Sequence, residues 1–161
     1  MKLAAVVLSV AALTMTAPSA SAQAKPNFAA KWTIVVDPNA PPAGGRGMRG
    51  LGQEATITQD ASTLTVVRTG PNGEIKSVYH LDGTDSKNTM TFGDNSIDML
   101  SKLKWDGDKL VITTTANFNG NAFETTMVLS VDASGSLVVD STSPGRGGGA
   151  PTTTRTTYKK A

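Results

Sequence analysis

The sequence predicts an all-β protein: an antiparallel up-and-down barrel of about ten strands, with a two-sheet β-sandwich as the alternative. Short runs rich in Val, Ile and Thr alternate with turns rich in Gly, Asn and Asp, at intervals of roughly ten residues. Within the runs, apolar and polar residues alternate, as expected for a strand with one buried face. No segment after residue 30 combines a helical apolar period with helix caps.

Ten segments are expected to form the strands. They are residues 31–37, 53–59, 63–69, 74–81, 88–92, 98–105, 109–116, 122–131, 136–142 and 152–160. Most are bounded on at least one side by Gly, Asn, Asp or Ser, and most are enriched in β-branched residues. The segment 97–103 is the one that could instead start as a helical turn.

Alternation within these segments assigns an inward face to the barrel. The outward positions of the fourth segment include Glu74, Lys76 and His80, so the sole histidine is expected on the surface. The residues expected to point inward are Trp32, Ile34 and Val36; Leu64, Val66 and Arg68; Ile75, Tyr79 and Leu81; Met99; and Phe123, Thr125, Met127, Leu129 and Val131.

Tight turns built on Asp and Gly indicate a meander. Residues 106–108 join one pair of segments and residues 132–135 join another. Turns of this kind connect neighbouring antiparallel strands. A meander leaves two unpaired edges, and pairing the first strand with the last would remove both. This favours a closed barrel over a sandwich.

The first 22 residues are expected to be a secretory signal peptide. Lys2 supplies a basic n-region, and residues 3–13 form an apolar stretch that is too short to span a bilayer. Residues 20–22 have the small-x-small form of a signal-peptidase site, with residues 22–24 as an alternative site. Cleavage after Ala22 leaves a single β-barrel domain over residues 23–161. The protein is therefore expected to be secreted or periplasmic, with no transmembrane segment in the mature chain.

The composition excludes several kinds of chemistry. The chain has no Cys, which removes disulfides, thiolate metal sites and Cys nucleophiles. A formal net charge of +2 is too small to indicate nucleic acid as a partner. One His cannot build a three-His metal site, and the inward face carries no carboxylate pair for glycoside hydrolysis. We therefore expect no metal, no cofactor and no nucleic-acid partner, and catalysis ranks behind two non-catalytic functions.

Two Arg-Gly loops, residues 41–52 and 144–151, are expected to meet in space. Eight predicted strands separate them, and connections in a meander alternate between the two ends of a barrel. An even number places both loops at one end, here called the Arg-Gly end. The opposite, Asp-rich end collects the turns at residues 59–62, 82–87, 106–108 and 132–135.

The Arg-Gly end is expected to be the entrance to a cavity that tolerates an anion, because Arg matches carboxylate geometry and Gly-rich backbone exposes amide donors. Its rim would carry Arg46, Arg49 and Arg146. The alternative is that the loops are flexible and carry Arg only for solvation. The residues expected to line the interior are Arg68, Tyr79, Met99, Phe123 and Met127.

The chain resembles lipocalins and fatty-acid-binding proteins at its two ends. Phe28 and Trp32 match a Phe that precedes a Gly-x-Trp opening the first strand in those families, although Ala30 stands in the place of that Gly. Near the end, Arg155 and Tyr158 are similar to an Arg-x-Tyr pair that binds a ligand carboxylate in fatty-acid-binding proteins. The spacing here is Arg-x-x-Tyr, which places the two side chains on opposite faces of a strand, so that role is not transferred. The resemblance implies a calycin barrel similar to secreted bacterial lipocalin-like proteins of unknown role, without the helical lid of fatty-acid-binding proteins.

The aromatic residues are expected to close the Asp-rich end. Phe28, Trp32 and Tyr158 would form a plug, with the Trp32 ring against the Tyr158 ring. The expected function is a secreted or periplasmic, non-catalytic binding module for a small hydrophobic, amphipathic or anionic ligand that enters at the Arg-Gly end. The alternative is a structural or interaction module of the cell envelope with a filled interior.

Overall fold

A computed structural model describes residues 25–36, 50–70, 73–92, 95–118, 120–145 and 149–161. The predicted signal peptide lies outside these residues, and so do the predicted rim residues Arg46, Arg49 and Arg146. Among the described residues there is no helix with the length and apolar character needed to cross a bilayer.

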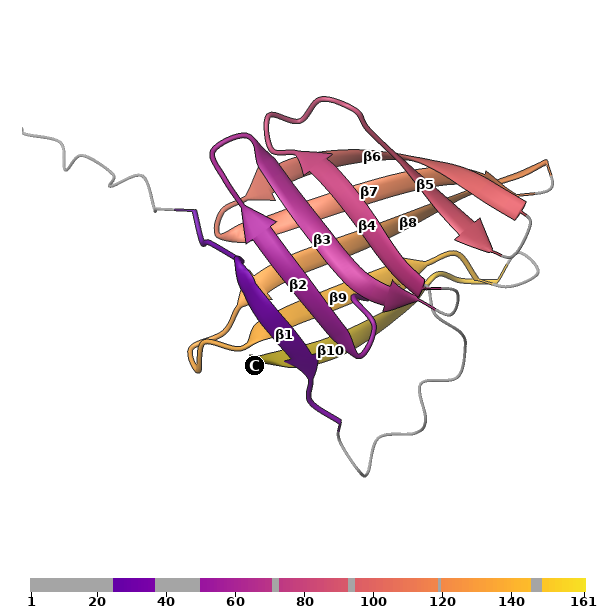
Figure 1. Cartoon of the computed structure of the whole chain (residues 1–161). Helices are drawn as coiled ribbons and strands as arrows, with labels where there is room; N and C mark the ends of the chain where they lie inside the picture. Colours follow the sequence, from indigo (N-terminus) through magenta and orange to yellow (C-terminus); the bar gives the residue numbers. More distant parts are fainter. Residues whose placement is uncertain (1–24, 37–49, 71–72, 93–94, 119, 146–148) are drawn as a thin grey trace, which may run out of the picture.

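Ten antiparallel strands form one sheet that curls into a nearly closed up-and-down barrel (Figure 1). The sheet order is β4-β3-β2-β1-β10-β9-β8-β7-β6-β5. The strands are β1 (Ala30–Ile34), β2 (Glu54–Gln59), β3 (Thr63–Gly70), β4 (Gly73–His80), β5 (Ser86–Phe92), β6 (Asn95–Asp106), β7 (Lys109–Phe118), β8 (Asn121–Val131), β9 (Leu137–Ser143) and β10 (Thr152–Lys160). The predicted fold class and meander are confirmed.

The strand ends differ from the prediction in two informative places. β1 stops at Ile34 instead of residue 37, and Val36 beyond it is 73% exposed. Val36 has the right alternation, but the barrel wall no longer continues beside it. β6 is a strand from Asn95 to Asp106, so the helical turn allowed for residues 97–103 is absent. Continuous pairing with both β5 and β7 keeps this segment extended.

The first and last strands pair, as predicted, but the sheet is interrupted between β4 and β5. Trp32 lies opposite Lys160 and Ile34 opposite Tyr158 in the β1–β10 pair. Closure was predicted to leave no unpaired edge. Instead, β4 and β5 lie at the two ends of the sheet order, and each has one unpaired edge. We call this gap the β4–β5 seam.

Side chains replace backbone pairing across the β4–β5 seam. The Asn88 amide accepts a hydrogen bond from the Val78 backbone N–H (2.8 Å) and donates one to the Val78 carbonyl (3.0 Å). The Ser86 hydroxyl accepts a hydrogen bond from the His80 backbone N–H (2.8 Å). An amide side chain has the same donor and acceptor as a peptide unit, so Asn88 occupies the place of a neighbouring strand.

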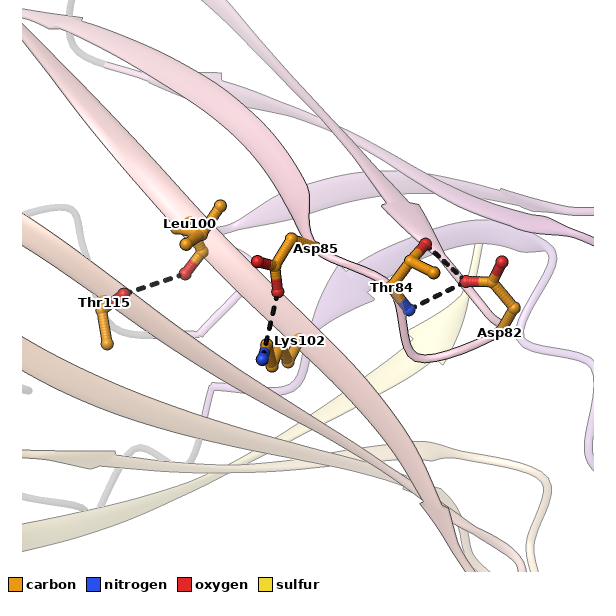
Figure 2. Close-up of polar contacts among 6 residues, drawn as sticks. All are labelled: Asp82, Thr84, Asp85, Leu100, Lys102 and Thr115. Atoms are coloured by element: carbon orange, nitrogen blue, oxygen red, sulfur yellow. Dashed lines mark hydrogen bonds and ion pairs between the residues drawn. The ribbon is translucent and has the colours of Figure 1, made fainter.

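Three turns at the Asp-rich end use the same local device. Asp60, Asp82 and Asp132 each accept a hydrogen bond from the backbone N–H two residues later, at 2.7, 2.9 and 2.9 Å. Figure 2 shows this for Asp82 and Thr84, beside an ion pair of 3.4 Å between Asp85 and Lys102. Such turns reverse the chain without a special backbone conformation at Asp.

The same hydrogen bonds favour the charged carboxylates. The pKa of Asp60 is lowered chiefly by the Thr63 hydroxyl, and next by the Ser62 and Thr63 amides. The pKa values of Asp82 and Asp132 are lowered chiefly by the hydroxyls of Thr84 and Ser134, respectively. A carboxyl group whose folded-state pKa is depressed stabilises the fold above its unfolded pKa and loses that contribution in acid.

An aromatic plug closes the Asp-rich end. The Phe28 ring is fully buried and stacks on Trp105, with ring centroids 6.1 Å apart. The Gln59 amide fixes the chain around it, accepting from the Phe28 N–H (3.0 Å) and donating to the Pro26 carbonyl (3.3 Å). The Trp32 indole N–H donates to the Phe28 carbonyl (2.8 Å). The plug is therefore anchored by hydrogen bonds as well as by burial.

The Tyr158 hydroxyl is bound on the side of the barrel away from this plug. The Tyr158 ring is buried, but its hydroxyl accepts a hydrogen bond from the Leu51 backbone N–H (3.1 Å), just before β2 at the Arg-Gly end. The ring pair at the Asp-rich end is Phe28 with Trp105, and the Trp32 ring meets the Lys160 ammonium instead, at 5.6 Å. A buried phenol needs a polar partner, and the plug region is occupied by apolar rings.

Removal of the plug should strongly destabilise the barrel. Phe28→Ala is expected to lower the free energy of unfolding by about 3–5 kcal/mol, because it leaves a cavity beneath Trp105. Val36→Ala, at an exposed position near the other end of β1, should change it by less than about 0.5 kcal/mol. Urea unfolding followed by Trp fluorescence measures both. A Phe28 variant as stable as the wild type would contradict the role of the plug.

Removal of the Asn88 amide should loosen the β4–β5 seam. Asn88→Ala is expected to lower the free energy of unfolding by about 1–3 kcal/mol, since it leaves both polar groups of Val78 without a partner. The Val78 amide should also exchange its proton faster with solvent. Thr91→Ala, at an exposed position of the same strand, is the matched control. Unchanged exchange at Val78 would show that Asn88 does not join the two strands.

The turn carboxylates predict a decline in stability in acid. Because the pKa values of Asp60, Asp82 and Asp132 are depressed in the folded state, their contribution is present above about pH 4 and is lost as the pH falls below it. Asp60→Asn should therefore make urea midpoints between pH 5 and 2 less sensitive to pH. Asp108→Asn, in another turn, controls for the change in net charge. Identical acid profiles for Asp60→Asn and the wild type would contradict this role.

Candidate functional site

The barrel encloses a cavity of about 100 Å³. All five residues that the sequence placed in the interior line it: Arg68, Tyr79, Met99, Phe123 and Met127. They come from β3, β4, β6 and β8, so the meander brings together side chains that are far apart in the sequence. Their positions agree with the alternation of the strands, while their part in binding a ligand stays a prediction.

The cavity reaches the Arg-Gly end of the barrel. Gly50 and Leu51, which precede β2, line it together with Thr142 and Ser143 at the end of β9. In the observed meander, the β1–β2 and β9–β10 connections lie at the same end (Figure 1). The parity argument is therefore correct for the described stems of both Arg-Gly loops.

Arg68 brings a positive charge into the wall of the cavity. Its Nη1 donates a hydrogen bond to the Gly50 carbonyl at 3.2 Å. Burial lowers the pKa of Arg68, and the nearby phenols of Tyr79 and Tyr158 oppose this shift. A guanidinium stays protonated in proteins, so this wall remains cationic at neutral pH.

The buried phenols of Tyr79 and Tyr158 lie near the positive charge of Arg68. Burial raises the pKa of Tyr79, opposed by a hydrogen bond with Ser77 and by the charge of Arg68. Burial also raises the pKa of Tyr158, opposed by the Leu51 amide and again by Arg68. Both hydroxyls are therefore neutral at physiological pH and present hydrogen-bonding groups instead of a phenolate.

The turn at Gly50 and Leu51 folds into the mouth of the barrel. Leu51 is 1% exposed and belongs to the hydrophobic core. Its backbone N–H donates a hydrogen bond to the Tyr158 hydroxyl, and the Gly50 carbonyl accepts one from Arg68. Gly50 has φ +71°, and a Cβ there would lie 3.1 Å from the Tyr158 hydroxyl. Both the backbone conformation and the space favour glycine. This turn was not predicted from the sequence. The one sign of it there is a single leucine, Leu51, within a glycine-rich loop.

Hydroxyl side chains form a second part of the wall, of which sequence reasoning had placed only Thr125 on an inward face. Ser77, Ser101, Thr114, Thr125 and Ser141 all line the cavity. The Ser101 and Thr114 hydroxyls bond each other at 2.8 Å. Their signal was available, since each occupies an inward position of its strand and all but Ser141 lie between apolar neighbours on that face.

Ser141 has an unusual environment within this wall. It is 8% exposed, and its hydroxyl oxygen is buried with no hydrogen-bond partner among the described residues. A buried polar atom without a partner costs free energy, so such atoms point to a water or a ligand at the site.

Arg155 and Tyr158 lie on opposite faces of β10, as their spacing predicted. Arg155 is exposed and forms a two-pronged ion pair with Asp140, with both N–O distances at 2.7 Å. This contact lowers the pKa of Asp140 and raises that of Arg155. Arg155 is therefore occupied outside the barrel while Tyr158 is buried inside.

The described part of the chain holds no group of three or more His, Cys, Asp or Glu side chains that could bind a metal ion. His80 is exposed at the end of β4, as expected from its outward position.

No protein-family model matches this chain. A search of curated proteins finds no match either. The architecture is compatible with a calycin-like fold, since the chain is a ten-stranded antiparallel meander whose first and last strands pair. The cavity and its residues therefore carry the argument about function.

Proposed function

We propose that the protein is a secreted or periplasmic, lipocalin-like and non-catalytic binding module, which takes a small amphipathic ligand through its Arg-Gly end. The observation that carries this proposal is the cavity, in which Arg68 lies among apolar and hydroxyl side chains. Export rests on the predicted signal peptide. The stems of both Arg-Gly loops at the cavity support that end as the entrance.

The volume of the cavity restricts the ligand to a small molecule. Sites for drug-sized ligands usually measure about 300–1,000 Å³, and an engineered cavity of about 150 Å³ holds benzene. The cavity here, of about 100 Å³, is smaller than that one, so it suits a ligand of at most about the size of benzene. This is much smaller than a long-chain lipid.

The charge of the wall favours an anionic group on the ligand. Arg68 is partly withdrawn from water, and a guanidinium forms paired, charge-assisted hydrogen bonds with a carboxylate. The methionines and Phe123 offer apolar contact to the rest of the molecule. The combination supports an acid with a short carbon skeleton.

The alternative function is a structural or interaction module of the cell envelope. The observation in its favour is the dense core, in which Phe28, Trp32, Leu110, Leu129 and Val139 are at most 1% exposed. If the remaining space holds only water, the barrel is a scaffold and its partners contact the outside.

Native mass spectrometry of protein purified from its own periplasm or medium distinguishes the two functions. A bound small acid is expected, and Arg68→Met should weaken its affinity about 10- to 150-fold, because a charge-assisted hydrogen bond contributes about 1.5–3 kcal/mol. Arg155→Met, which removes an exposed guanidinium, is the matched control. Native protein that carries no ligand and binds no small acid would favour the scaffold.

A further inference from the structure

A row of hydroxyl groups crosses the inner face of the barrel. In the strand register, Ser86 of β5 lies opposite Ser101 of β6, Ser101 opposite Thr114 of β7, and Thr114 opposite Thr125 of β8. On β9, Ser143 follows the residue paired with Thr126, and so lies level with Thr125. Neighbouring strands are about 4.8 Å apart, so the row repeats a hydroxyl at roughly that interval.

The hydroxyls of this row that can form further hydrogen bonds lie in the wall of the cavity. Ser86 is used at the β4–β5 seam, where it bonds His80, and Ser101 bonds Thr114. The cavity is lined by Ser101, Thr114, Thr125 and Ser143. A hydroxyl offers one donor and two acceptor positions, so a bond between two members leaves capacity for a third group.

Ser141 gives independent evidence that a polar group belongs beside this row. It lies next along the inward face of β9 from Ser143, and its buried oxygen lacks a partner. It also lies 3.9 Å from the position that a Cβ would take at Gly50, where the mouth of the cavity begins. A purely apolar ligand packed here would leave Ser141 unsatisfied, at a cost of about 1–3 kcal/mol.

The charges around the row favour an acid over a base. Of the described residues that line the cavity, none is Asp, Glu or Lys, and Arg68 is the one with a full charge. The remaining polar groups are neutral hydroxyls, including that of Tyr79. A ligand carboxylate would therefore bind the Arg68 guanidinium, and hydroxyl groups of the same ligand would form hydrogen bonds with hydroxyls of the wall.

We infer that the ligand of this cavity is a short hydroxy acid, a carboxylate of about six or seven non-hydrogen atoms that bears one or two hydroxyl groups. This inference rests on the proposed binding function and names its ligand class. Arg68 holds the carboxylate, while Thr125 and Ser141 bond the hydroxyl groups. Alkyl acids are disfavoured for two reasons: long chains exceed the cavity, and short ones leave the Ser141 hydroxyl without a hydrogen-bond partner.

A pair of matched acids tests the inference on the unmodified protein. Glycerate and 2-methylbutanoate have the same skeleton of non-hydrogen atoms, with hydroxyls in the first replaced by methyl groups in the second. Isothermal titration calorimetry is expected to give at least about tenfold tighter binding of glycerate, since two hydrogen bonds are gained. Dodecanoate should bind more weakly than glycerate because it does not fit.

Substitutions on the wall locate the selectivity. Thr125→Val and Ser141→Ala should each weaken glycerate binding about threefold to tenfold and leave 2-methylbutanoate binding unchanged or tighter. Thr113→Val removes a hydroxyl from the outward face of β7, beside Thr114, and should change neither. Thermal unfolding of each variant checks that the barrel is intact. The comparison of acids on the wild type remains decisive if a variant unfolds.

The outcomes separate this inference from the proposed function. Tighter binding of 2-methylbutanoate or dodecanoate than of glycerate, with loss in Arg68→Met, would overturn the hydroxy acid and keep the binding module. Binding of none of the three acids would overturn the inference, and native protein without a ligand would then remove the binding function too. Equal effects of Thr113→Val and Thr125→Val would also overturn it.

Discussion

Pairing of the first strand with the last is the interaction on which the other features of this barrel depend. β1 is short, yet its register with β10 and β2 joins the two halves of the meander into one curved sheet. Closure at this point brings β3 and β4 opposite β6 to β9, and so places Arg68 across a common interior from Thr125 and Ser141. Without that pair, the two halves would be separate sheets with four exposed edges.

In a closed and filled barrel, backbone pairing and apolar packing hold all parts of the wall together. In this barrel, polar side chains take over that role at two places. At the β4–β5 seam, the Asn88 amide and the Ser86 hydroxyl satisfy backbone groups that a neighbouring strand would otherwise bind. At the mouth, Arg68 and Tyr158 hold the Gly50–Leu51 turn. Part of the interior is a conventional core, and part is a small cavity lined by hydroxyl and apolar side chains.

The fold was predictable from the sequence to a greater extent than the site. Alternation in the segment that became β8 correctly placed Phe123 and Met127 inside, and the same rule placed Arg68 inside on β3. The rule failed for Val36, because alternation persists in the sequence after the barrel wall ends. The hydroxyl wall was overlooked, since Ser and Thr at inward positions carry no apolar signal. The hydrogen bond from the Leu51 N–H to the Tyr158 hydroxyl was not predicted, because burial of the ring does not determine which partner the hydroxyl finds.

The sequence by itself determined the all-β class, the order of the strands, the inward face of several strands and the division into an Arg-Gly end and an Asp-rich end. These follow from local rules, namely two-residue alternation, turn chemistry and the parity of a meander. Only the tertiary structure decided where the sheet is interrupted, how large the cavity is and that Ser141 lacks a partner. Those properties depend on curvature and on contacts between residues far apart in the chain, such as Leu51 with Tyr158. No local pattern encodes them, because each is the joint result of strand register and side-chain volume around the whole barrel.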